Sequence, residues 1–170
     1  MLRRILALAI AGAAATASAQ FSTPDPDWKE AEAPPPPALR TRGLIPLEIP
    51  GSSLRFGVDP ASIVVGSDGV VRYVVVATGP GGAVNGIYEG IRCSSAEVRV
   101  YARHNPDSGW VQAKTGDWQP LHGGTNFRYS LYLARNGVCI GHANNGPAVQ
   151  IVRDLQAPND RRFERGGVNR

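Results

Sequence analysis

Glu89 is the residue whose type and position most clearly suggest chemistry in this chain of 170 residues. If Gly86–Cys93 forms a regular strand, alternation places Glu89 on the same face as Ile87, Ile91 and Cys93. Burying an unpaired carboxylate is costly and raises its pKa. Glu89 is therefore either the general acid or base of a hydrolase acting on a glycan or ester, or a structural carboxylate that another group satisfies. The residues favour the structural interpretation.

The structural interpretation requires a partner for Glu89. Arg72 and Arg92 are the ion-pair candidates, and Arg72 is the expected partner because its strand is the neighbouring one. Two alternatives stay open: a loop amide could bind the carboxylate, or a bulge at Gly90 could turn it to solvent. A closed ion pair would remove the reason to suspect catalysis, whereas a cleft with a second titratable group would support it.

A candidate binding surface lies on the next predicted strand, Ala96–Arg103. Strict alternation predicts four inward and four outward side chains along it. The inward set is Ala96, Val98, Val100 and Ala102, and the outward set is Glu97, Arg99, Tyr101 and Arg103. An exposed tyrosine flanked by arginines suits stacking and charge contacts with a ligand. We therefore predict Arg99, Tyr101 and Arg103 as binding residues.

Other chemistries receive little support from the sequence. His104, His122 and His142 have no ligand-like spacing with the two cysteines, so no metal site and no cofactor are expected. No Gly-x-Ser-x-Gly elbow is present. The formal net charge is only +4, which does not indicate a nucleic-acid partner. The sequence gives no indication of oligomeric state.

The N-terminal residues predict export from the cytoplasm. Arg3 and Arg4 precede an apolar run from Ile5 to Ala15, and the sequence Ala-Ser-Ala at residues 17–19 stands before Gln20. This pattern is typical of a signal peptide over residues 1–19, cleaved after Ala19. The run is too short to span a bilayer, and no cysteine follows the cleavage site. We therefore expect neither a transmembrane anchor nor a lipid anchor.

Cys93 and Cys139 are the only cysteines. In an exported protein, two cysteines usually form a disulfide. The chain-entropy model gives about 4 kcal/mol of stabilisation for a loop of this length. Two free thiols or a metal pair are the alternatives, and the lack of further ligands disfavours the metal. No Cys-x-x-Cys motif is present, so thiol-exchange catalysis is not predicted.

Proline positions predict an extended arm over residues 20–43. Pro24, Pro26 and the run Pro34–Pro37 favour polyproline II and exclude a long helix. Asp27–Ala33 is compatible with one short helical turn capped by its aspartate. Trp28 is expected to anchor the arm on the domain, because burial of its indole offsets the loss of chain entropy.

Residues 44–156 are predicted to form a single α+β domain, with a curved antiparallel β-sheet and two short C-terminal helices packed on it. Alternating and apolar runs predict the strands Leu44–Ile49, Leu54–Val58, Ser62–Val65, Val70–Thr78, Gly86–Cys93 and Ala96–Arg103, followed by short segments at Trp110–Ala113 and Trp118–Leu121. Three-to-four spacing predicts helices over Phe127–Val138 and from Pro147 to Leu155. The arginine-rich tail, residues 157–170, is expected to be disordered.

Several segments resemble the core signature of the cryptic neisserial protein-like family of exported proteobacterial proteins. They are Asp68–Tyr73, Gly82–Ala83, Tyr88–Cys93 and Tyr101–Ala102, and Tyr88–Cys93 is the most specific. The resemblance covers about residues 27–155, and it implies a periplasmic domain of a Gram-negative cell with no established activity or catalytic residues.

From the residues and this resemblance we expect a periplasmic envelope protein, a non-catalytic binding or structural domain. Its expected partner is an envelope protein or a cell-wall component. The alternative is a periplasmic hydrolase that uses Glu89. A third hypothesis is a subunit whose exposed sheet edge accepts a partner strand.

Overall fold

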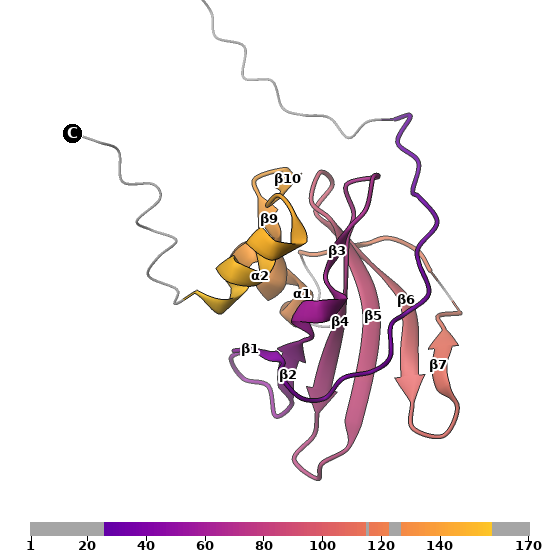
Figure 1. Cartoon of the computed structure of the whole chain (residues 1–170), viewed down its shortest axis with the longest axis vertical. Helices are drawn as coiled ribbons and strands as arrows, with labels where there is room; N and C mark the ends of the chain where they lie inside the picture. The colour runs from indigo at the N-terminus through magenta and orange to yellow at the C-terminus, as the bar shows by residue number, and fades with distance from the viewer. Residues whose placement is uncertain (1–25, 115, 123–126, 158–170) are drawn as a thin grey trace, which may run out of the picture.

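The computed structural model describes residues 26–114, 116–122 and 127–157 (Figure 1). The predicted signal peptide, residues 1–19, lies outside the described residues, and so do residues 158–170 of the predicted disordered tail.

Among the described residues, eight antiparallel strands form one open sheet. Its spatial order is β1-β2-β4-β5-β6-β7, with β3 beside β4 and β8 beside β6. The strands are β1 (Ile45–Leu47), β2 (Arg55–Val58), β3 (Val64–Val65), β4 (Val71–Thr78), β5 (Val84–Arg92), β6 (Glu97–Asn105), β7 (Gly109–Gln112) and β8 (Gln119–Pro120). The 3-10 turn η1 (Pro60–Ser62) precedes β3. The predicted α+β class with an antiparallel sheet is confirmed.

Strand β4 lies in the interior of the sheet and is covered on both faces, as its nearly continuous apolar sequence predicts. All its residues except Thr78 are buried. Val71, Tyr73 and Val75 belong to the core on the helix side. Val74 and Val76 belong to a second, smaller core on the opposite side, which we call the arm side.

The two predicted C-terminal helices are present. Helix α1 (Arg128–Leu133) continues directly into the π-turn η2 (Ala134–Val138), and α2 (Ala148–Gln156) follows the two-stranded hairpin of β9 (Cys139–Ile140) and β10 (Ala143–Asn144). Figure 1 shows both helices together at one side of the sheet. Asn145 Nδ2 donates to the carbonyl of Gly137, at 2.9 Å, and to Asp154 Oδ2, at 2.7 Å. These bonds tie η2 to α2.

The predicted disulfide between Cys93 and Cys139 is confirmed. Its Cα atoms are 5.7 Å apart, within the range that disulfides adopt. Cys93 directly follows β5, and Cys139 directly follows η2. The bond therefore joins the central sheet to the end of the first helical segment, as expected.

The N-terminal arm packs against the sheet instead of extending into solvent. In Figure 1 it runs in indigo alongside β5 and β6. Trp28 anchors it as predicted, since its indole N–H donates to the carbonyl of Asp68 at 2.9 Å. The short helical turn that the sequence of Asp27–Ala33 would allow does not form. The N–H and C=O of Ala31 instead bind the side chains of Asp68 and Arg72.

A bulge in β6 changes which side chains share a face. Tyr88 pairs with Ala102 and Glu89 pairs with Val100, so Tyr101 is one extra residue in β6. Tyr101 and Ala102 consequently both pack in the arm-side core. The predicted alternation is therefore wrong at Ala102, which was expected to share the face of Val100. It is also wrong at Arg103, as described below.

Candidate functional site

Glu89 lies in a cage of three hydroxyl groups at the centre of the helix-side core. Tyr73 Oη, on the adjacent β4, donates to Glu89 Oε1 at 2.7 Å. Ser130 Oγ donates to the same oxygen at 2.7 Å, and Tyr129 Oη donates to Oε2 at 3.2 Å. The Glu89 side chain has no solvent exposure. The sequence correctly places Glu89 on the apolar face, and α1 brings two of the three donors to it.

The ion pair expected between Arg72 and Glu89 is wrong. Arg72 lies opposite Gly90 in the β4–β5 register, so its side chain extends to the arm side, away from Glu89. It pairs there with Asp68 at 2.7 Å. Arg92, the other candidate, lies 3.9 Å from Glu97 and stacks on the indole of Trp28 at 3.7 Å from the ring centroid.

Burial has the largest effect on the pKa values of Glu89 and of the two tyrosines in the cage. It raises the pKa of Glu89 above its ordinary value, although the three hydroxyl donors and the charge of Arg103 act in the opposite direction. Burial and the nearby carboxylate likewise raise the pKa of Tyr73 and Tyr129. A general acid must reach the proton acceptor of its substrate. The Glu89 side chain has no exposed surface, and its three hydrogen bonds connect β5 to β4 and α1.

Two of the three predicted binding residues hold the arm. Glu30 lies at the centre of a group that we call the arm clamp, formed by Glu30, Arg72, Arg99, Tyr101 and Trp118. Tyr101 Oη donates to Glu30 Oε1 at 2.6 Å, and Arg99 and the Trp118 indole donate to Oε2. Burial raises the pKa of Tyr101, and its hydrogen bond to Glu30 adds to this effect.

Asp68 lies outside the arm clamp, but it pairs with Arg72 and also holds the arm. Its carboxylate accepts hydrogen bonds from Arg72 and from the backbone N–H groups of Ala31 and Val70. Burial by itself raises the pKa of Asp68, but these hydrogen bonds and the Arg72 charge together hold it below its ordinary value. The carboxylate is therefore stabilised in its charged form, and it connects the turn before β4 to the arm.

Arg103, the third predicted binding residue, lies on the opposite face of the sheet from the arm clamp. After the bulge it pairs with Ile87, which belongs to the helix-side core. Its side chain is exposed and forms no hydrogen bond or salt bridge with any residue that the structure describes. Arg99, Tyr101 and Arg103 therefore do not form one surface.

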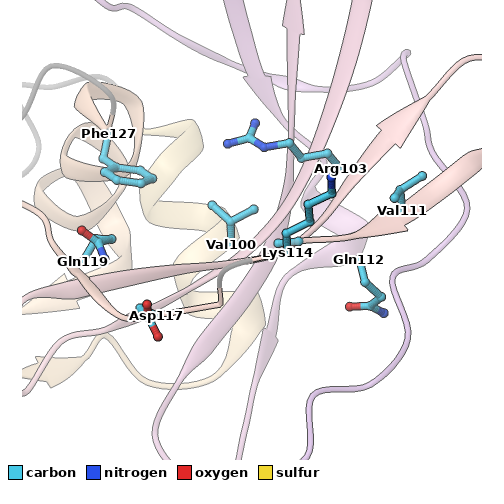
Figure 2. A pocket seen from close by; sticks show the side chains of 9 residues that line it. Val100, Arg103, Val111, Gln112, Lys114, Asp117, Gln119 and Phe127 are labelled. Carbon is cyan, nitrogen blue, oxygen red and sulfur yellow. The ribbon is translucent and has the colours of Figure 1, made fainter.

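Two pockets meet at Arg103. The first, which we call the β7 pocket, has a volume of about 540 Å³ and lies between β6, the segment after β7 and Phe127. Figure 2 shows the Arg103 side chain extending above Val100 toward the side on which Phe127 lies. Lys114 and Asp117 also line this pocket.

The second pocket, which we call the loop pocket, has a volume of about 580 Å³. The segment Ile49–Leu54 and α1 form its sides together with the ends of β2, β4 and β5. Phe56 and Tyr129 stack at a centroid distance of 4.9 Å and line it. Arg103 and Arg128 both line it. Sequence reasoning missed this pocket, because its residues come from five separate segments with no common motif.

Neither a metal site nor a membrane span is found in the described part of the chain. No group of three or more His, Cys, Asp or Glu residues within 26–114, 116–122 and 127–157 is arranged to hold a metal ion. None of the helices in these ranges is long and apolar enough to cross a membrane.

Comparison with protein families identifies a relationship that covers most of the chain. The model of the CNP1-like family matches residues 23–156. The matched span includes the described part of the arm, the whole sheet and helix α2 to its last residue, Gln156. No curated protein and no solved structure matches the chain.

Proposed function

The chain belongs to the CNP1-like family, and we propose that it is an exported envelope protein that binds a cell-wall component without converting it chemically. The observation that carries this proposal is the contrast between Glu89 and Arg103. The carboxyl group with the expected acid–base character has no exposed surface. The exposed arginine on the same face opens onto two pockets.

The size and polarity of these pockets support binding. Their volumes of about 540 and 580 Å³ lie in the range of small-ligand sites. Phe127 in the β7 pocket and the stacked pair Phe56 and Tyr129 in the loop pocket offer aromatic surface beside the arginine. Polar groups at the rim of an aromatic wall give a ligand both orientation and buried area.

Export to the periplasm is part of the same proposal. It is supported by the pattern of Arg3, Arg4 and the apolar run that ends before Gln20. The disulfide between Cys93 and Cys139 agrees with an oxidising compartment. Expression of the full chain in a Gram-negative host tests this part. Mass spectrometry of periplasmic material should find Gln20 as the first residue, and cytoplasmic protein that retains Met1 would contradict export.

Co-sedimentation with purified peptidoglycan tests the binding part. The mature protein should sediment with the polymer, and the Arg103→Gln variant should sediment less. Arg153→Gln is the matched control, because Arg153 is an exposed arginine on α2 that lines neither pocket. Absence of wild-type protein from the pellet would overturn the proposal and leave an envelope protein as the partner to seek.

The same experiment separates binding from hydrolysis at Glu89. Peptidoglycan incubated with the wild-type protein should release no soluble glycan or peptide fragments. The Glu89→Gln variant should bind as the wild type does, provided that circular dichroism confirms its fold. Fragments released by the wild type but not by Glu89→Gln would establish the hydrolase alternative and overturn the non-catalytic assignment.

A further inference from the structure

The loop pocket is lined by positive charge, and no carboxylate is part of its described lining. Arg103 and Arg128 both line it, and its described lining includes no Asp or Glu. Arg128 Nη2 donates to the carbonyl of Pro50, which holds this side chain against the loop. The planar N–H groups of guanidinium match the two oxygens of a carboxylate or phosphate. The charge of the pocket therefore favours an anionic ligand.

The remaining lining is uncharged and combines apolar with neutral polar side chains. Phe56, Ile87 and Tyr129 provide a hydrocarbon wall, and Ser53 and Asn85 add neutral polar groups. An anion that carries small aliphatic groups would use both the arginines and this wall, whereas inorganic phosphate would leave the wall uncovered. The volume of about 580 Å³ holds a few residues of a peptide. A protein partner would need a much larger contact area.

We propose that the loop pocket binds the free carboxylate end of a short wall peptide, in which alanine-sized side chains lie next to the carboxylate. Arg103 and Arg128 would hold the carboxylate, and the aromatic wall of Phe56 and Tyr129 would contact the methyl groups. The inference rests on the proposed function, because the cell wall is the source of such peptides.

Titration calorimetry of the mature, disulfide-bonded protein with three synthetic peptides tests the inference. The probes are N-acetyl-L-lysyl-D-alanyl-D-alanine, its C-terminal amide and the all-L acid. The D-alanyl acid should bind at least about tenfold more tightly than its amide, because loss of the charge removes the charge-assisted hydrogen bonds. It should also bind more tightly than the all-L acid.

Variants of the two arginines locate the site. Arg103→Gln and Arg128→Gln should each weaken binding of the D-alanyl acid by about tenfold or more, while Arg153→Gln should leave it unchanged. Arg128 also supports the loop through Pro50, so its variant counts only if its thermal unfolding matches that of the wild type. Arg103 forms no hydrogen bond or salt bridge with a described residue. Its variant therefore decides the test if Arg128→Gln fails to fold.

Each contrary result is informative. Equal affinity for the acid and the amide would overturn the carboxylate site. Equal or tighter binding of the all-L acid would indicate a protein C-terminus and overturn the wall peptide. Full competition by inorganic phosphate at the peptide's own concentration would indicate a simple anion site and overturn it too. If any of these occurs while the protein still sediments with peptidoglycan, the proposed function stands and only this inference fails.

Discussion

Tyr101 donates a 2.6 Å hydrogen bond to Glu30, across a separation of 71 residues in the chain. Tyr101 lies on the face of β6 opposite Val100 and packs in the arm-side core, and the bulge places the next residue, Ala102, on that same side. The same carboxylate accepts from Arg99 and Trp118. One arm residue therefore satisfies three donors from β6 and from the segment before β8.

Replacing Glu30 should release the arm. Glu30→Gln loses the charged acceptor for Arg99, and we expect the free energy of unfolding to fall by about 1–3 kcal/mol. Exchange of the Ala31 amide, which donates to Asp68, should become faster. Hydrogen-exchange mass spectrometry and urea unfolding measure the two effects. Glu32→Gln, an exposed position in the same arm, should change neither, and an equal effect there would contradict the clamp.

Stability should depend on pH through Glu89. Its pKa is higher in the folded protein than in the unfolded chain. Between these two pKa values the folded protein therefore holds a proton that the unfolded chain has released. The corresponding stabilisation is complete below the unfolded pKa and is lost as the pH rises through the folded pKa. We therefore expect the stability of the wild type relative to Glu89→Gln to decrease from about pH 4 toward neutral pH.

Urea unfolding of both proteins at a series of pH values measures this difference. All other titrating groups are shared, so they cancel in the comparison unless they contact the cage. A difference that is constant with pH, or that increases with pH, would contradict a raised pKa for Glu89. Glu89→Ala should be far less stable at every pH, by roughly 2–5 kcal/mol, because it leaves three buried hydroxyls without their acceptor.

Removing the disulfide should destabilise the protein at every pH. The double variant Cys93→Ala/Cys139→Ala opens the loop between β5 and β9, and the chain-entropy model gives a loss of about 4 kcal/mol. Calorimetry should show a lower melting temperature than that of the oxidised wild type. Reduction of the wild type should lower it similarly. An unchanged melting temperature in both experiments would show that the bond adds no stability.

A side chain at Gly90 should disturb the arm clamp, because it would press against Tyr101. A Cβ there would lie 2.8 Å from Val70 and 3.0 Å from both a ring carbon and the hydroxyl oxygen of Tyr101. We expect Gly90→Ala to lower the free energy of unfolding by about 1–3 kcal/mol and to accelerate exchange at Ala31. Gly81→Ala is the control, because a Cβ at Gly81 meets nothing within 4 Å. Equal stability of the two variants would contradict the close contact.

The sheet, the helices and the disulfide were predictable because each depends on a local pattern. Apolar content and turn residues define β4 and its neighbours, and the spacing of apolar residues defines α1 and α2. The pairing of Cys93 with Cys139 follows from an even count in a chain with an export pattern.

The partners of the functional candidates could not be predicted, because they depend on register. Alternation put Glu89 on the apolar face correctly, but only the pairing of β4 with β5 shows that Tyr73 faces it and Arg72 does not. The bulge at Tyr101 has no marker in the sequence, and it moved Arg103 to the opposite face from Tyr101. A single extra residue thus separated a predicted surface into an internal clamp and an open pocket.

The docked arm also imposes an order on assembly. Synthesis from the N-terminus produces Trp28 and Glu30 well before β6 and Trp118, which later bind the Glu30 carboxylate. Contacts between distant parts of a chain form late in folding. The arm therefore stays undocked until the sheet has formed. Until then the side of the sheet around Tyr88 and Ala102 stays uncovered. A newly synthesised chain thus passes through a stage in which the arm does not yet cover this side of the sheet.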